Sequence, residues 1–178
     1  MAGTGPGITL DFVDTPPERE AYRAMMIDFY RGIRELLTAA GGPDLVPEEA
    51  ADASLAQMDK LLPPVGRLVV ARDGAGRIVG TGALRLVGGD AAEFKRMYVR
   101  PEARGAGLGR ALFEARIAEA RALGCRRLLA DTVKGNTPML TLYGRYGFRQ
   151  IPRFPENFNP PELEPFLVYL EYRLPQDG

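Results

Sequence analysis

The chain has 178 residues, of which 46% are hydrophobic, and this is enough for one domain with a sizeable buried core. Its 23 Lys and Arg residues balance 23 Asp and Glu residues, so no strong positive field is present to bind the phosphates of a nucleic acid. Because the sequence has no histidine, it excludes a Ser-His-Asp triad, a histidine-bound zinc and a histidine-ligated haem.

The cysteine content and the chain ends indicate the cellular setting. The single cysteine, Cys125, cannot form an internal disulfide, and there is neither an apolar run of about 18 residues nor a charged-then-apolar leader. We therefore expect a cytoplasmic protein whose partners include neither a membrane nor a nucleic acid. Residues 1–7 hold three glycines and a proline and are expected to form a flexible leader, followed by a single domain over residues 8–178.

The N-terminal third of the chain predicts one strand and two helices. Residues 8–13 alternate apolar and polar side chains, which is typical of a short strand. Thr15 is placed to cap a helix, with a proline at the first helical position and Glu18 completing a capping box. Apolar residues then recur at helical spacing as far as Gly41, and a second helix is expected over residues 47–62, where two prolines end it.

The middle of the chain changes to the period of strands. Residues 67–72, 78–87 and 91–99 are predicted strands joined by two glycine-rich turns, which indicates an antiparallel meander. A predicted helix over residues 109–123 and a strand over residues 126–133 follow. Strand, helix and strand in this order indicate a parallel crossover.

The C-terminal part predicts one more helix and two more strands. The helix begins at Thr137, a short strand covers residues 148–151, and the last strand covers residues 166–174. Between the two strands, residues 153–165 hold four prolines and three glutamates. The predicted fold is α/β, with a mixed, mostly antiparallel central sheet flanked by about four helices.

A glycine-rich turn, R-G-A-G-L-G over residues 104–109, follows a predicted strand and opens a helix. Glycines let the backbone approach an anion, and the free amides at a helix start favour phosphate oxygens. The alternative is that the glycines only allow a tight connection between the strand and the helix, without binding an anion. A dinucleotide-binding turn, with Asp131 as the ribose-binding acid, is disfavoured because the spacing is not G-x-G-x-x-G and too few elements follow for a doubly wound fold.

Together with this turn, the segment E-F-K-R-M-Y-V-R-P-E over residues 93–102 resembles the acyl-CoA-binding core of the GNAT superfamily of N-acetyltransferases. The positions that match the family's motifs are Arg104, Gly107, Gly109, Asn136 and Tyr143. The resemblance covers about residues 91–151. It therefore implies the fold and the donor site, whereas the parts that would choose an acceptor lie outside it.

The resemblance implies acetyl-CoA as cosubstrate and no metal. The backbone of the glycine turn would hold the coenzyme A pyrophosphate, and the edge of the strand ending at Val99 would pair with the pantetheine arm. Such an edge offers donors and acceptors to an amide-rich ligand. The cofactor-binding residues expected on this basis are Met97, Tyr98, Val99, Arg104, Gly105, Ala106, Gly107, Leu108, Gly109 and Asn136.

Two residues are the expected catalytic groups. Tyr143 is implied by the family as the proton donor to the departing thiolate, with an ordinary core aromatic as the alternative. Glu93 is the general-base candidate, acting directly or through water, because it lies on the strand leading to the thioester and no histidine competes. Its alternative is a carboxylate on an exposed sheet face. Asn136 either bonds the cofactor or its water, or shapes the loop before Thr137.

These residues predict an N-acetyltransferase that moves an acetyl group from acetyl-CoA to a primary amine by direct attack. The alternative is a non-catalytic acyl-CoA-binding sensor or structural module of the same fold. The acceptor would be a small molecule or a peptide, and the protein a monomer or homodimer. Residues 153–165 are expected to wall the acceptor pocket, where Glu156, Glu162 and Glu164 would attract an ammonium group.

Overall fold

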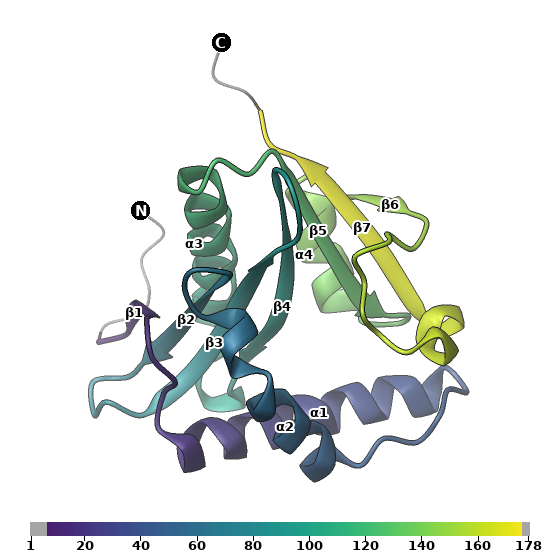
Figure 1. The fold of residues 1–178 in the computed structure, drawn as a ribbon. Coiled ribbons are helices and arrows are strands. Elements are labelled where there is room, and N and C mark those ends of the chain that lie inside the picture. The colour runs from purple at the N-terminus through teal and green to yellow at the C-terminus, as the bar shows by residue number, and fades with distance from the viewer. Residues whose placement is uncertain (1–6, 176–178) are drawn as a thin grey trace.

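A computed structural model, which describes residues 7–175, has seven strands in one sheet, in the order β1-β2-β3-β4-β5-β7-β6 (Figure 1). The strands are β1 (Thr9–Val13), β2 (Gly66–Arg72), β3 (Ile78–Leu86), β4 (Ala91–Val99), β5 (Arg127–Val133), β6 (Arg149–Ile151) and β7 (Leu167–Arg173). All neighbouring pairs are antiparallel except β4 and β5, which are parallel. The mixed, mostly antiparallel sheet and its parallel crossover are therefore confirmed. Apart from Gly7, the leader predicted for residues 1–7 lies outside the described residues.

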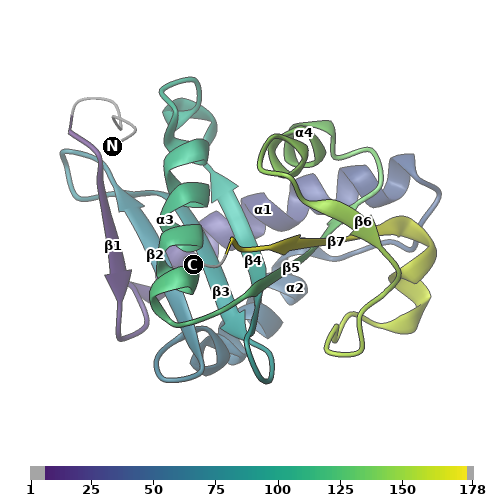
Figure 2. The same cartoon turned by 90° about the horizontal axis from the view of Figure 1, so that it is seen from above.

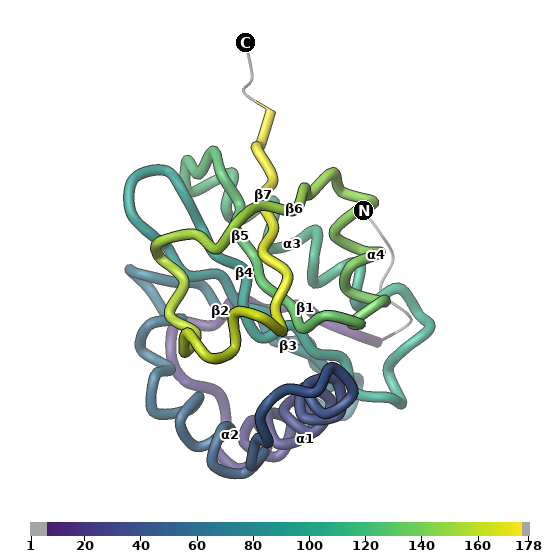
Figure 3. The backbone as a smooth tube through the Cα atoms, turned by 90° about the vertical axis from the view of Figure 1, so that its right-hand side faces the viewer, coloured from purple at the N-terminus to yellow at the C-terminus, as the bar shows by residue number. Residues whose placement is uncertain are grey.

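Four α-helices cover the sheet within residues 7–175. They are α1 (Arg19–Ala39), α2 (Pro47–Ala56), α3 (Leu108–Ala122) and α4 (Thr137–Arg145), with 3-10 helices at Met58–Leu61, Pro101–Ala103 and Pro161–Phe166. Figures 2 and 3 show α3 and α4 on one face of the sheet and α1 and α2 on the other. No helix of the described segment is long and apolar enough to cross a membrane.

The start of α1 differs from the prediction. The helix begins at Arg19, and its N-cap residue, Glu18, makes no capping hydrogen bond through its side chain. The carboxylate of Glu18 instead accepts a hydrogen bond of 2.7 Å from Arg72 on β2. The predicted capping box starting at Thr15 is therefore wrong, because a partner far along the chain takes the carboxylate that the box requires.

The pairing of β4 with β5 is short. Only Ala91–Phe94 face β5, and Phe94 is paired with Ala130. Beyond this point β4 bends: Arg96 has a φ of 51°, and the register of β4 against β3 shifts, which marks a β-bulge. The two strands start side by side and then diverge towards α1 (Figure 1). As a result, the second half of β4 has a free edge on the side of β5.

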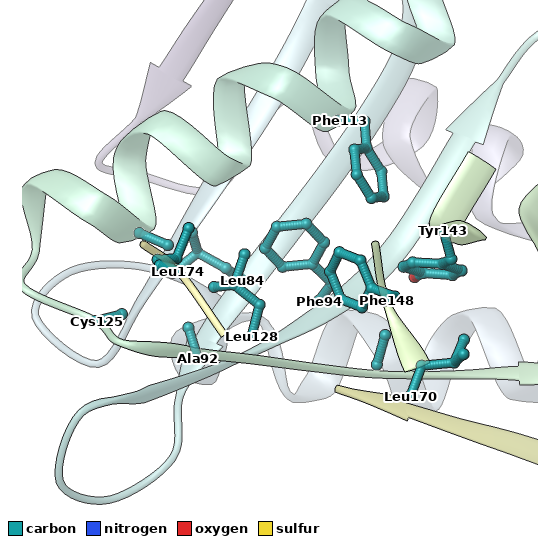
Figure 4. Close-up of a cluster of buried hydrophobic side chains, with 12 residues drawn as sticks. Leu84, Ala92, Phe94, Phe113, Cys125, Leu128, Tyr143, Phe148, Leu170 and Leu174 are labelled. Atoms are coloured by element: carbon teal, nitrogen blue, oxygen red, sulfur yellow. The ribbon is translucent and has the colours of Figure 1, made fainter. Parts of the chain in front are cut away.

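An aromatic cluster fills the layer between α3, α4 and the sheet (Figure 4). The ring of Phe113 lies 5.5 Å from that of Phe94 and 5.4 Å from that of Tyr143, measured between centroids. Phe148 adds a contact of 4.9 Å with Tyr143. Such ring pairs stabilise a core beyond the apolar area that they bury. The cluster fixes α4 against the sheet beside the point where β4 and β5 separate.

The start of β2 packs closely against the preceding 3-10 helix. A Cβ on Gly66 would lie 2.6 Å from the carbonyl oxygen of Lys60 and 2.7 Å from the Cα of Leu61. We expect Gly66→Ala to lower the free energy of unfolding by about 1–3 kcal/mol, because backbone atoms would have to move. Urea unfolding followed by circular dichroism measures this change.

The matched control is Gly32 in α1, where an added Cβ would meet no atom within 4 Å. Gly32→Ala is expected to raise the free energy of unfolding by about 0.5–1 kcal/mol, because alanine loses less backbone entropy in a helix than glycine. Equal stability of the two variants would contradict this packing.

Candidate active site

A cleft of about 590 Å³ opens where β4 and β5 separate. The residues that line it on the two strands, Phe94–Met97 and Asp131–Val133, come at or just after the last paired residues, Phe94 and Ala130. Side chains of α1, α2, α4 and the segment before β7 complete its walls. The end of strand pairing therefore creates the cavity, and the helices enclose it.

The glycine turn lies at the end of β4 and opens α3. Gly105 and Gly107 have φ values of 85° and 78°, in the left-handed region that glycine adopts without strain. Within residues 7–175, the amides of residues 108–110 donate no hydrogen bond to the chain, as expected for the first turn of a helix. Together with the positive end of the helix, these amides form a site suited to phosphate oxygens.

The turn connects to the cleft through Met97. A Cβ on Gly109 would lie 3.6 Å from the Cε of Met97, and Met97 lines the cleft. Arg104 anchors the turn by donating a hydrogen bond of 3.0 Å to the carbonyl of Val99. The expected donor residues are thus contiguous, although residues 104–109 lie beside the cleft rather than in its lining. Tyr98 packs on the α1 side, 6.3 Å from Phe29 between ring centroids.

Tyr143 joins the core to the cleft. Its side chain is 3% exposed, its ring belongs to the aromatic cluster, and the residue lines the cleft. Burial raises the pKa of Tyr143 to about 12, against the opposing effect of the nearby Arg116 guanidinium. The phenol is therefore protonated throughout the neutral range. The proton-donor and core-aromatic interpretations of this residue are compatible.

Asn136 also lines the cleft, at the N-cap of α4. Its side-chain amide donates a hydrogen bond of 2.9 Å to the hydroxyl of Thr132 on β5. This bond fixes the loop between β5 and α4. The loop-shaping role expected as one alternative is thus present in the geometry, and the side chain still faces the cavity.

Glu93 belongs to a buried charge network that we define by five residues. Its carboxylate is fully buried and accepts bonds of 2.6 Å from both Arg85 and Lys95. Lys95 also contacts the carboxylate of Asp131 at 2.9 Å. The amide of Asn157 donates to Asp131 at 2.9 Å and to Glu93 at 3.4 Å. Two anions and two cations are therefore satisfied together below the cleft.

The members of the network differ in whether they reach the cleft. Arg85, Lys95 and Asp131 line the cleft, whereas Glu93 does not. Burial by itself would lower the pKa of Lys95, but Asp131 and Glu93 outweigh it and raise the pKa above its ordinary value. Lys95 is therefore a stable cation between two carboxylates. The sequence interpretation identified Glu93 but missed the cation that separates it from the cavity.

Arg116 is a second functional candidate that the sequence interpretation missed. The side chain is fully buried on α3, and burial lowers its pKa to about 10. It donates to the carbonyls of Leu112 and Ala83 and contacts the sulfur of Met97 at 2.8 Å, while its guanidinium lies 4.3 Å from the centroid of Phe94. The signal in the sequence was an arginine at helical spacing among apolar residues.

The segment over residues 153–165 forms one wall of the cleft, through Phe158, Asn159, Pro160 and Leu163. None of the three glutamates of the segment lines the cavity. Glu164 forms an ion pair with Arg153, and the backbone carbonyl of Glu156 accepts a bond from Arg85. The wall thus has the expected position, but it presents apolar and amide groups instead of carboxylates.

Comparison with known proteins identifies the class to which this site belongs. Residues 28–148 match the acetyltransferase (GNAT) family. The chain is 37% identical over 123 residues to an uncharacterized N-acetyltransferase of Schizosaccharomyces pombe, which covers 68% of this chain and 75% of that protein. The chain belongs to the GNAT family, as its motifs predict, and it is an acetyltransferase.

Two solved structures share the fold. An acetyltransferase from Streptococcus agalactiae 2603 gives a TM-score of 0.72 at 22% identity and covers 95% of this chain and 99% of that one. A GNAT family acetyltransferase from Elizabethkingia anophelis with acetyl-CoA bound gives a TM-score of 0.62 at 18% identity, with coverage of 95% and 99%. The split between β4 and β5 therefore occurs in a fold that these proteins share.

The buried charge network generates a test of stability. Lys95→Met is expected to lower the free energy of unfolding by about 3 kcal/mol at pH 7, because two buried carboxylates lose a shared cation. The pKa of Lys95 is raised in the folded protein, so its stabilising effect is complete below about pH 10.4 and is lost as the pH rises through the folded value. The difference between wild type and variant should therefore shrink above that pH.

The control is Lys134→Met, at an exposed position on the turn after β5. Its free energy of unfolding should stay within about 0.5 kcal/mol of wild type. Urea unfolding at neutral and alkaline pH gives both values, and equal losses in the two variants would contradict the network.

Proposed function

We propose that the protein transfers the acetyl group of acetyl-CoA to a primary amine of a small molecule or peptide by direct attack. The observation that carries the proposal is the protonated phenol of Tyr143, which lines the cleft where β4 and β5 separate. Membership of the GNAT family and the acetyl-CoA bound in a protein of similar fold support this donor.

The residues present fit acetyl-CoA. Within residues 7–175, the amides of residues 105–110 donate no hydrogen bond to the chain and would suit a pyrophosphate, and the edge of β4 from Met97 to Val99 would offer backbone donors and acceptors to an amide-rich arm. Asn136 lines the cleft at the N-cap of α4 and would be available to the pantetheine arm. When bound, acetyl-CoA supplies an activated thioester.

Side chains of this protein would supply the proton that the thiolate needs and remove the proton of the attacking amine. In this proposal Tyr143 holds, on its Oη, the proton that a departing thiolate requires. Asp131 is the only carboxylate among the described residues that line the cleft, so it would be the nearest one to an acceptor bound there. Glu93 keeps its proposed part in removing the amine proton, but in this proposal it acts through a water molecule, since both of its oxygens are bonded by neighbouring side chains and Lys95 is already protonated.

Substitution of the phenol tests the catalytic role. Tyr143→Phe is expected to retain coenzyme A binding and to slow turnover by roughly 10²- to 10⁴-fold, because it removes only the proton donor. Free thiol release from acetyl-CoA with a panel of amines measures turnover. The rise in melting temperature with coenzyme A measures binding.

Tyr146→Phe is the matched control, since this tyrosine ends the same helix and donates its hydroxyl proton to Glu114, away from the cleft. It should keep wild-type turnover. An unchanged rate in Tyr143→Phe would contradict the proton-donor role and leave Tyr143 as an ordinary core aromatic.

A non-catalytic acyl-CoA-binding module is the second candidate, because the geometry suits binding independently of transfer. Binding of coenzyme A by wild type, with no thiol release for any amine, would favour it. A cleft that binds no coenzyme A at all would contradict both functions.

A further inference from the structure

The cleft is lined by more cations than anions. Its charged residues within the described chain are Lys60, Arg85, Lys95, Arg96, Arg116 and Asp131. Arg85 and Lys95 are neutralised by the carboxylates of the buried network. Lys60 and Arg96 have no ion pair within residues 7–175. The lining thus carries unpaired positive charge, which is unsuited to a purely cationic acceptor.

Arg96 is the most unusual of these cations. It occupies the bulge of β4 with a φ of 51°, the only positive φ of a non-glycine residue within residues 7–175. Its Nη1 atom is buried and has no hydrogen-bond partner in the described chain. Strained backbone and unsatisfied buried donors are both costly, and strained residues cluster at active sites and ligand clamps.

The charge of Arg96 acts on a side chain of α1. Burial raises the pKa of Tyr22 on α1, and the charge of Arg96 acts on the same phenol in the opposite direction. Arg96 also lines the cleft together with Phe29 and Tyr30 of α1, which is consistent with a guanidinium on the α1 side. This is the face on which α2 packs as well.

A second unpartnered donor comes from α2. The hydroxyl of Ser54 is buried, the residue is 2% exposed, and the oxygen has no hydrogen-bond partner within residues 7–175. Ser54 and Arg96 line the same cleft, together with Tyr30 and Phe29 of α1. Within residues 7–175, the Nη1 of Arg96 and the hydroxyl of Ser54 both lack an acceptor, and a carboxylate would supply acceptor oxygens and a negative charge.

We propose that Arg96, aided by Ser54, binds a carboxylate of the acceptor, so that the acceptor class is amino carboxylic acids. This inference rests on the proposed acetyl transfer to an amine. Asp131 and Tyr143 also line the cleft and would face the amine of such an acceptor, and Phe29 and Tyr30 of α1 are available to its carbon skeleton. The cleft then holds an anion at one end and an amine at the other.

Matched pairs of acceptors test this inference. We would compare L-phenylalanine with L-phenylalaninamide and L-leucine with L-leucinamide, with kcat/KM calculated on the neutral amine, because the amides lack the carboxylate and also have a lower amine pKa. For wild type, kcat/KM should be about 10- to 100-fold higher for the acids, mainly through KM, because a charged hydrogen bond is lost with the amides. The preference should weaken with added salt.

The variants Arg96→Gln and Ser54→Ala show which residue causes the preference for the acids. Arg96→Gln should abolish the preference for the acids, and Arg96→Lys should restore part of it, because lysine keeps the charge without the fork. Ser54→Ala should reduce the preference by a smaller factor. Arg126→Gln is the control, an exposed arginine before β5 that lies outside the cleft lining. It should keep the full preference.

Calorimetric titration of the coenzyme A-loaded protein with the same pairs measures acceptor binding without turnover. Tighter binding of the acids that Arg96→Gln removes supports the inference, even if no acetyl group is transferred and the proposed function fails. Equal binding and equal kcat/KM within each pair would overturn it. A preference for the acids that survives in Arg96→Gln and in Ser54→Ala would also overturn it.

Discussion

The end of pairing between β4 and β5 is the constraint on which the rest of the site depends. Four residues of β4 face β5, after which the bulge at Arg96 turns the strand away. One structural change therefore has three consequences. It leaves a free strand edge for an extended ligand, it opens the cleft between the strands, and it brings the end of β4 to the glycine turn through Met97.

Charged side chains are buried beside the cleft between β4 and β5. The network around Glu93 is costly to desolvate, and it is stable because both oxygens of Glu93 and the Oδ2 of Asp131 have donors. Lys95 and Asp131 bring part of that network to the cavity surface. On the side of α3, Arg116 is held by carbonyls and aromatic rings, and no carboxylate within residues 7–175 forms an ion pair with it. Charges fixed before a ligand binds need little reorganisation during a reaction.

Local patterns sufficed to predict most of the fold. Alternation in strands, helical spacing and the glycine turn depend on residues close together in the sequence, and the resulting sheet and crossover are confirmed. The same patterns failed at Glu18, whose carboxylate pairs with Arg72 on β2. A short motif predicts a cap only when no distant side chain competes for it.

The candidate site was less predictable, because its chemistry depends on contacts between distant segments. Glu93 was predicted as the general base from its strand position. Its bonding partners, however, come from β3, from β4 itself and from the segment before β7. Glu164 of that segment pairs with Arg153 instead, and Arg96, whose Nη1 has no partner within residues 7–175, occupies a bulge that the sequence did not reveal. Tyr143 and Asn136 were found because a family motif fixes their spacing.

Hydrogen exchange with and without acetyl-CoA, read by mass spectrometry at peptide resolution, tests most directly whether the free edge of β4 and the glycine turn bind the donor. The account predicts slower exchange in residues 97–99 and 105–110, because their amides would gain acceptors from the ligand. Unchanged exchange there at saturating acetyl-CoA, or protection confined to the outer strands β1 and β6, would contradict it.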